Sequence, residues 1–146
     1  MTELAGVVDF LRRTEKFIIT AHETPDGDAI GSEYAMLRVL RGMGKTAAIF
    51  NADPTPRKFR FLDAEGSVGM LSSAADLPTD IAEHALLMLD TSDVHNIGQV
   101  ASLVLPRVRE HYIIDHQNIV QIHCYVLASH NNPECVPLFN WIVGAL

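Results

Sequence analysis

The chain has 146 residues, with 11 lysines and arginines against 18 aspartates and glutamates, so its formal net charge is −7. This length suits one domain, and 48% hydrophobic with 20% charged residues is typical of a globular chain rather than a disordered one. The acidic balance argues against a protein that coats nucleic acid non-specifically, because such binding needs an excess of lysine and arginine.

Features of secreted and membrane proteins are not visible in the sequence. The first residues lack the basic and apolar segments of a signal peptide, and no apolar run approaches the ~20 residues of a membrane span. The two cysteines, Cys124 and Cys135, are too few for a disulfide framework. We therefore expect a cytoplasmic protein with no membrane partner.

The first third of the chain predicts a helix, a strand, a second helix and a second strand. Residues 3–13 carry leucines and valines at helical spacing, whereas residues 17–21 form a short apolar run that is β-branched at its centre. Residues 29–43 have apolar side chains three and four apart and end among glycines, as helices often do. Residues 46–50 are the second strand candidate.

The rest of the patterned region continues this alternation less regularly. A stretch with three prolines predicts only a short helix at 57–62 and a strand near Val68. Residues 85–89 and 111–114 are apolar runs of strand length, separated by a predicted helix at 99–105. Strands that are apolar throughout and alternate with helices predict an α/β fold, with a doubly wound, mainly parallel sheet covered by helices on both faces.

Residues of the types that bind metal ions follow three of the predicted strands. They are His22, Asp26 and Asp28, then Asp90 and Asp93, then Asp115 and His116. Because ligands bind at the carboxyl ends of strands in an open parallel sheet, we expect these side chains to converge there. Carboxylates and imidazoles suit Mn²⁺, Mg²⁺ or Zn²⁺. Taken singly, each cluster has another interpretation: Asp28 could cap the helix that follows it, and His22 could be a core histidine.

Three segments resemble motifs of the DHH family of phosphoesterases. Residues 22–32, which read HETPDGDAIGS, are similar to the first motif; residues 89–93 (LDTSD) resemble the second and 113–116 (IIDH) the start of the third. The family includes RecJ-like exonucleases, oligoribonuclease/pAp phosphatases of the NrnA kind, cyclic-dinucleotide phosphodiesterases and family II inorganic pyrophosphatases. The resemblance covers about residues 1–116, and the wording of the motifs is nearest to the NrnA branch.

The resemblance implies a phosphoesterase that uses two Mn²⁺ ions, or Mg²⁺ or another divalent cation, to activate water. The implied ligands are His22, Asp26 and Asp90 for one ion and Asp28, Asp90 and His116 for the other. Asp115 would orient His116, while Gly31 and Ser32 would lie beside the substrate. The implied substrate is a short oligonucleotide or a nucleotide phosphate.

The chain departs from the family at its third motif. Gln117 stands where the family has a second histidine, so a neutral side chain replaces a group that contacts the scissile phosphate. Beyond it, neither the family's further aspartate ligand nor its C-terminal substrate domain is recognisable. We expect a DHH-type domain at 1–116, an atypical apolar tail at 117–146 and slow or absent turnover. A frameshift would explain this tail.

Several alternatives remain open at this point. The chain could be a truncated or degenerate DHH domain without catalysis, or it could resemble a pyrophosphatase or a cyclic-dinucleotide phosphodiesterase. Arg57, Lys58 and Arg60 could contact a phosphate backbone or form a solvated helix face. The oligomeric state is open, although the apolar tail favours self-association through residues such as Trp141.

Overall fold

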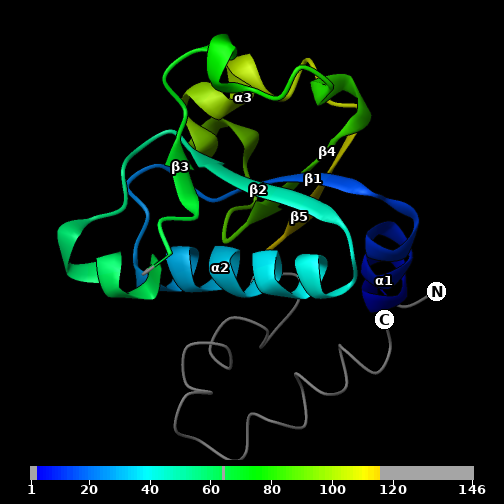
Figure 1. Ribbon diagram of the computed structural model, residues 1–146, viewed down its shortest axis with the longest axis horizontal. Helices are drawn as coiled ribbons and strands as arrows, with labels where there is room; N and C mark the ends of the chain where they lie inside the picture. Colours follow the sequence, from blue (N-terminus) through cyan, green and yellow to red (C-terminus); the bar gives the residue numbers. More distant parts are fainter. Residues whose placement is uncertain (1–2, 64, 116–146) are drawn as a thin grey trace, which may run out of the picture.

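The computed structural model describes residues 3–63 and 65–115, which form a five-stranded parallel sheet (Figure 1). Its strands are β1 (Lys16–Thr20), β2 (Thr46–Asn51), β3 (Val68–Met70), β4 (Ala85–Leu89) and β5 (Glu110–Ile114). They lie in the order β3-β2-β1-β4-β5, and every neighbouring pair is parallel. The predicted α/β fold with a parallel sheet is therefore confirmed. Because the chain builds outward from β1 on one side and then on the other, the strand order reverses between β1 and β4.

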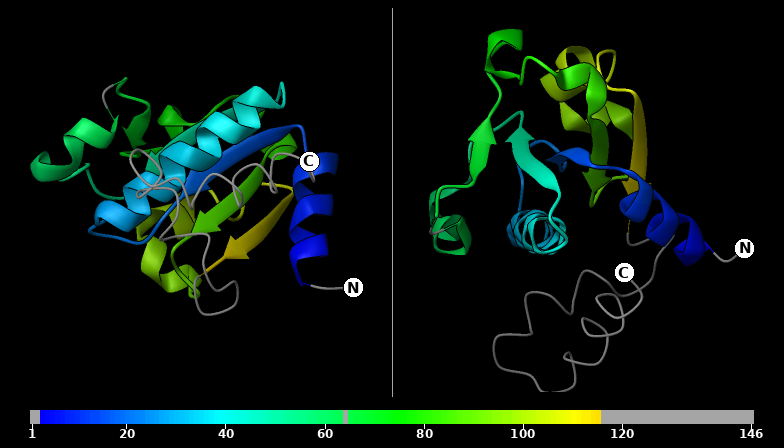
Figure 2. Two further views of the ribbon diagram at one scale, coloured as in Figure 1. Left: turned by 90° about the horizontal axis from the view of Figure 1, so that it is seen from below. Right: turned by 45° about the vertical axis from the view of Figure 1, so that its right-hand side comes forward.

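Helices cover both faces of this sheet. The α-helices are α1 (Glu3–Arg13), α2 (Gly27–Gly42) and α3 (Gln99–Leu103), and the 3-10 helices are η1 (Arg57–Asp63), η2 (Ala74–Asp76), η3 (Ile81–Glu83) and η4 (Val94–Ile97). Figures 1 and 2 show α1 and α2 on one side of the sheet and α3 on the other. This arrangement is the doubly wound layering that the sequence pattern predicted.

Each central strand contributes side chains to two hydrophobic clusters, one on each face. Phe17 and Ile19 of β1 pack with α1 and α2, whereas Ile18 between them packs with α3 and η4. In β4, Leu87 points to the first cluster and Leu86 to the second. All of these side chains are fully buried, and burying one such side chain stabilises a fold by roughly 1.5–3 kcal/mol. Burial on both faces explains why these strands are apolar at every position.

The boundaries or types of three helices differ from the prediction. Helix α2 begins at Gly27, two residues before the expected start, because Asp26 rather than Asp28 caps it. The predicted helix at 57–62 is a 3-10 helix with no buried residue, so it has no apolar stripe to hold an α-helix against the core. Helix α3 ends at Leu103, two residues early.

Among the described residues, no helix combines the length and the apolar character needed to cross a membrane. His116 and Gln117 of the third motif lie outside the described residues, as does the segment 117–146 with its expected self-association.

Candidate metal centre

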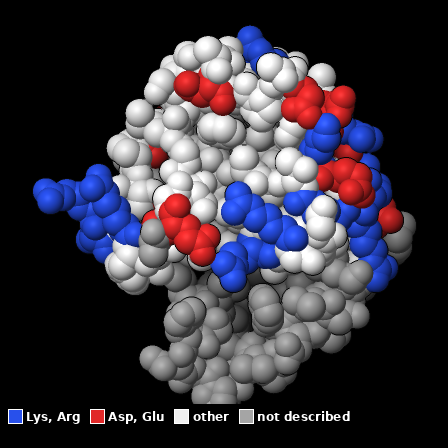
Figure 3. All heavy atoms as spheres, in the orientation of Figure 1, with Lys and Arg blue, Asp and Glu red and all other residues white. Residues whose placement is uncertain are grey.

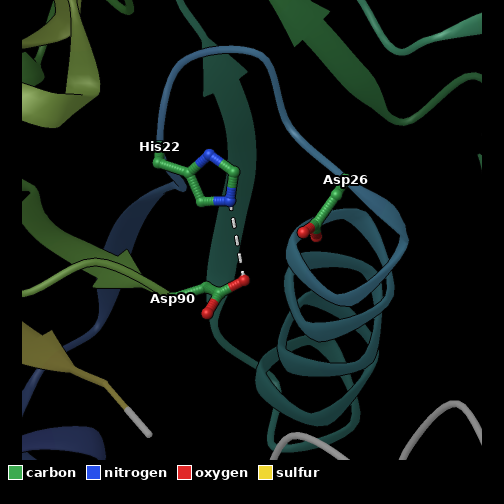
Figure 4. Close-up of side chains that lie close together, drawn as sticks. All are labelled: His22, Asp26 and Asp90. Atoms are coloured by element: carbon green, nitrogen blue, oxygen red, sulfur yellow. Dashed lines mark ion pairs between the residues drawn. The ribbon is translucent and has the colours of Figure 1, made fainter. Parts of the chain in front are cut away.

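His22, Asp26 and Asp90 lie together at the carboxyl edge of the sheet (Figure 4). Each offers one ligand atom, and these atoms all lie within 4.8 Å of one another. His22 follows β1, Asp26 precedes α2 and Asp90 follows β4. Because β1 and β4 are the neighbours between which the strand order reverses, the trio occupies the position where open α/β sheets bind their ligands.

A hydrogen bond sets the orientation of the His22 ring. Its Nδ1 lies 2.7 Å from the backbone carbonyl oxygen of Glu23, and since a carbonyl can only accept, Nδ1 carries the proton. The other ring nitrogen, Nε2, faces Asp90, whose Oδ2 lies 3.6 Å away. That separation is too long for a hydrogen bond but suits two ligands of one cation, each ~2.1 Å from the ion. A histidine held through its other nitrogen in this way is typical of metal ligands.

Asp26 is held by the helix that it caps. Its Oδ1 accepts hydrogen bonds from the backbone amides of Asp28 and Ala29, both at 3.0 Å, and its backbone is extended, as an N-cap requires. Its Oδ2 takes part in neither bond. The start of α2 also stabilises a negative charge through the aligned peptide dipoles. One side chain therefore serves both helix capping and the candidate metal centre.

Asp90 has a backbone conformation that is rare outside glycine. Its φ is +56°, in the left-handed region, and its amide donates to the carbonyl of Ile114 in β5 at 3.2 Å. Aspartate tolerates this region better than most residues, at a cost of about 1–2 kcal/mol. The turn aims the carboxylate at His22 directly after the fully buried strand β4.

The loop that carries His22 is tied to its neighbours on two sides. The amide of Glu23 donates to the carbonyl of Asn96 in η4 at 2.7 Å, and the amide of Thr24 donates to Asp53 at 2.8 Å. Gly98 lets these segments approach, because its φ is +54° and a Cβ there would lie 2.8 Å from the Cβ of Ala52. These contacts hold the β1 loop against the loop that follows β4.

The remaining predicted site residues have different surroundings. Asp28 lies exposed in the first turn of α2 and does not belong to the close trio, and the interpretation of Asp28 as the helix cap is wrong. Asp93 caps η4, and its Oδ1 lies 2.7 Å from Nδ1 of His95. Hydrogen bonds from His95 lower the pKa of the Asp93 carboxyl group. Asp115 is buried directly after β5.

Gly31 and Ser32, expected beside the substrate, lie on the second turn of α2. Gly31 is buried there, and Ser32 is half-buried.

A buried carboxyl group, Glu33, and its partner Asn51 were not expected from the sequence. Both side chains are inaccessible to solvent, and Asn51 Nδ2 donates to Glu33 Oε2 at 2.9 Å. The signal was present, because Glu33 lies three residues after Ile30 and four before Leu37, on the buried stripe of the helix. An acidic residue on that stripe indicates a buried polar contact rather than a solvated face.

Lys and Arg side chains gather over α1, α2 and η1 on the face shown in Figure 3, with acidic side chains among them. Arg38 pairs with Glu65 at 3.3 Å, and the Lys45 ammonium group pairs with Glu15 at 3.0 Å. Of the three basic residues in η1, Arg60 lines a surface pocket of about 280 Å³ together with Asp53 and Asp63. The three basic residues of η1 are exposed, as the interpretation of a solvated face requires.

The similarity to known proteins is partial in length. No protein-family model matches the chain. Over 60 residues, which is 40% of this chain, it is 47% identical to the bifunctional oligoribonuclease and PAP phosphatase NrnA of Thermus thermophilus, and the match spans 18% of that protein.

A solved structure supports the fold. The chain matches an exopolyphosphatase-related protein from Bacteroides fragilis with a TM-score of 0.64 at 21% identity, over 77% of this chain and 34% of that one. At this identity the likeness concerns the fold alone. Taken with the curated relative and the three motifs in their order, it confirms the predicted resemblance to the DHH family of phosphoesterases, over part of the length of those proteins.

Proposed function

We propose that the chain is the metal-binding part of a phosphoesterase that hydrolyses phosphate esters of short oligonucleotides or nucleotides with divalent cations, Mn²⁺ preferred. The observation that carries the proposal is the convergence of His22, Asp26 and Asp90 where the strand order reverses. The substrate class comes from the printed name of the curated relative, an oligoribonuclease and PAP phosphatase.

The donors present suit such a cation. One imidazole nitrogen and two carboxylate oxygens form a set that Mn²⁺ accepts, and His22 Nε2 faces Asp90 while Nδ1 bonds to the Glu23 carbonyl. Two carboxylates this close repel each other, so a cation between them stabilises the folded chain. His22, Asp26 and Asp90 would hold one ion; the motif resemblance assigns a second ion to Asp28, Asp90 and His116.

The protein's contribution to catalysis is placement. When bound, two divalent cations supply charge neutralisation of the phosphoryl oxygens and activation of water. His22 stays oriented through its bond to the Glu23 carbonyl, and Asp26 through the amides of α2. Groups held in place before the reaction stabilise developing charge without reorganising, which is a large part of catalytic rate enhancement.

Gln117, which stands where the family has a histidine, is expected to lower the rate of hydrolysis. A neutral amide donates a weaker hydrogen bond to a phosphate oxygen than a charged imidazolium does. Removing one well-placed donor to a transition state typically costs ~10²–10³ in rate. We therefore expect hydrolysis by this chain to be slow.

The experiment combines a binding assay with a hydrolysis assay on the 146-residue chain. Mn²⁺ is titrated while the thermal midpoint is followed, and a dinucleotide, pAp and pyrophosphate are then offered as substrates. Asp90→Ala is the test variant, and Asp9→Ala is the control because Asp9 is an exposed carboxylate on α1.

Each outcome selects one function. Mn²⁺-dependent cleavage of the dinucleotide or pAp, lost in Asp90→Ala and kept in Asp9→Ala, supports the proposal. Cleavage of pyrophosphate alone favours a pyrophosphatase. Mn²⁺ binding without cleavage identifies a non-catalytic metal-binding domain, and no effect of Mn²⁺ on the thermal midpoint contradicts the metal centre altogether.

A further inference from the structure

A carboxyl group is buried on α2, the helix that Asp26 caps. Glu33 on α2 has no solvent exposure, and only its Oε2 has a hydrogen-bond partner among the described residues, namely Asn51 at 2.9 Å. Burial in this position raises the pKa of Glu33 to about 8, because a charged carboxylate is poorly solvated there. At neutral pH the group is therefore mostly the neutral acid.

Asn51 connects Glu33 to the strand end that carries His22. The same amide side chain accepts from the hydroxyl of Thr20 at 3.2 Å and from the backbone amide of Ala21 at 3.3 Å. Ala21 directly precedes His22 in the chain. A continuous set of hydrogen bonds therefore runs from α2 through the end of β2 to the end of β1.

Asp26 caps the helix that carries Glu33, so Glu33 links the segments that position Asp26 and His22. Asp26 caps α2 seven residues before Glu33, and the Asn51 contact holds that helix to the strand end before His22. Loss of this contact would free the helix to shift relative to β1. Such a shift would alter the separation of the two ligands that α2 and β1 position.

The charged groups that act on Glu33 come from two other elements, and both are negative. Asp63 at the end of η1 and Asp90 after β4 each raise the pKa of Glu33, whereas the hydrogen bond from Asn51 lowers it. A cation bound at Asp90 would neutralise one of these negative charges and add positive charge nearby. It would therefore favour the ionised form of Glu33.

Resting on the proposed function, we propose that Glu33 is a positioning residue whose ionisation is coupled to the occupancy of the His22–Asp26–Asp90 trio. Through Asn51 its carboxyl group holds the end of β1 against α2. When a divalent cation binds the trio, Glu33 releases a proton to solvent. By linkage, the affinity for the cation then rises with pH.

The test measures Mn²⁺ binding to the full chain by titration calorimetry at pH 6, 7 and 8, in two buffers with different ionisation enthalpies. The two buffers report the number of protons released per bound Mn²⁺. Glu33→Gln keeps an oxygen that can accept from Asn51 but cannot ionise, and Glu33→Ala removes the contact as well. Glu65→Gln is the control, since Glu65 is exposed and pairs with Arg38.

We expect Glu33→Gln to match the wild-type affinity at pH 6 and to fall behind it by about 5-fold at pH 8, the lower end of typical coupling. Near pH 7 it should release fewer protons than the wild type. Protons released by groups other than Glu33 are common to both chains and cancel in the comparison. Glu33→Ala should bind Mn²⁺ more weakly at every pH, and Glu65→Gln should behave as the wild type.

Two results overturn the inference while leaving the proposed function intact. Equal proton release by the wild type and Glu33→Gln removes the coupling, and this comparison holds even if Glu33→Ala does not fold. A folded Glu33→Ala that binds Mn²⁺ as tightly as the wild type removes the positioning role. A wild-type chain that binds no Mn²⁺ at any pH refutes the proposed function and this inference together.

Discussion

The two loops that meet at the candidate metal centre hold their side chains in different ways. In the loop between β1 and α2, short-range hydrogen bonds orient the two candidate ligand side chains: His22 bonds to the next residue's carbonyl, and Asp26 accepts from amides two and three residues ahead. Asp90 instead depends on a distant strand, because its left-handed backbone is tied to Ile114 of β5. Local contacts therefore orient the two candidate ligands of the first loop, whereas the sheet orients that of the second.

Substitutions of Asp26, Asp90 and Glu33 can measure three different contributions to the stability and metal binding of this region. In the first loop, Asp26 combines a structural role with a proposed ligand role. In the second loop, Asp90 adopts a left-handed backbone conformation that directs its carboxylate toward His22. Glu33, buried on α2, makes the stability of the fold depend on pH.

The largest effect is expected for Asp90→Ala. At a Mn²⁺ concentration 100 times the dissociation constant, binding stabilises a folded chain by about 2.7 kcal/mol. Removing a ligand that the proposal assigns to both ions should abolish this gain, and thermal unfolding with and without Mn²⁺ measures it. A Mn²⁺-dependent rise retained in Asp90→Ala would show that the cation binds elsewhere.

The metal-free chain should lose stability as pH rises. The pKa of Glu33 is raised by burial from 4.5 to about 8, so the folded state binds a proton that the unfolded state has released. The contribution of Glu33 to the free energy of unfolding is complete below about pH 4.5 and is lost as pH rises through about 8. The free energy of unfolding falls by up to roughly 1 kcal/mol per pH unit in this range. Urea unfolding from pH 5 to 8 should show this decline in the wild type. An equal decline in Glu33→Gln would assign it to another group.

Substitutions of Asp26 should separate capping from metal binding. Asp26→Ala loses both functions, and loss of the cap costs about 1 kcal/mol in the absence of metal. Asp26→Asn keeps an oxygen for the amides of Asp28 and Ala29 but lacks the charge. It should retain metal-free stability and lose most of the Mn²⁺-dependent gain. If both variants are equally unstable without metal, the capping bonds contribute little.

The smallest effect concerns the backbone of Asp90. Glycine adopts a φ of +56° without strain, whereas alanine does not, so metal-free Asp90→Gly should be more stable than Asp90→Ala by about 1 kcal/mol or less. Chemical denaturation without Mn²⁺ compares the two variants. Equal stabilities would indicate that the turn relaxes once the carboxylate is gone. Neither variant should respond to Mn²⁺.

Much of the fold was predictable because strand and helix signals are local. The run at 17–21 and the run at 85–89 are apolar at each position, and such runs indicate strands buried on both faces. The position of His22 and Asp90 after those runs predicted a shared edge, and the structure brings these two side chains to 3.6 Å. The 3-10 geometry of η1 was not predictable from the sequence pattern, because the structure buries none of its side chains fully.

The sequence by itself determined the strands, the layering on both faces and the order of the motifs, since side-chain periodicity and capping act over a few residues. The tertiary structure alone decided that β1 and β4 are neighbours, that Asp90 turns into the left-handed region and that Glu33 is buried against Asn51. These features depend on which distant segments pack together. Strand pairing and desolvation are long-range effects, and the residue type at one position does not specify them.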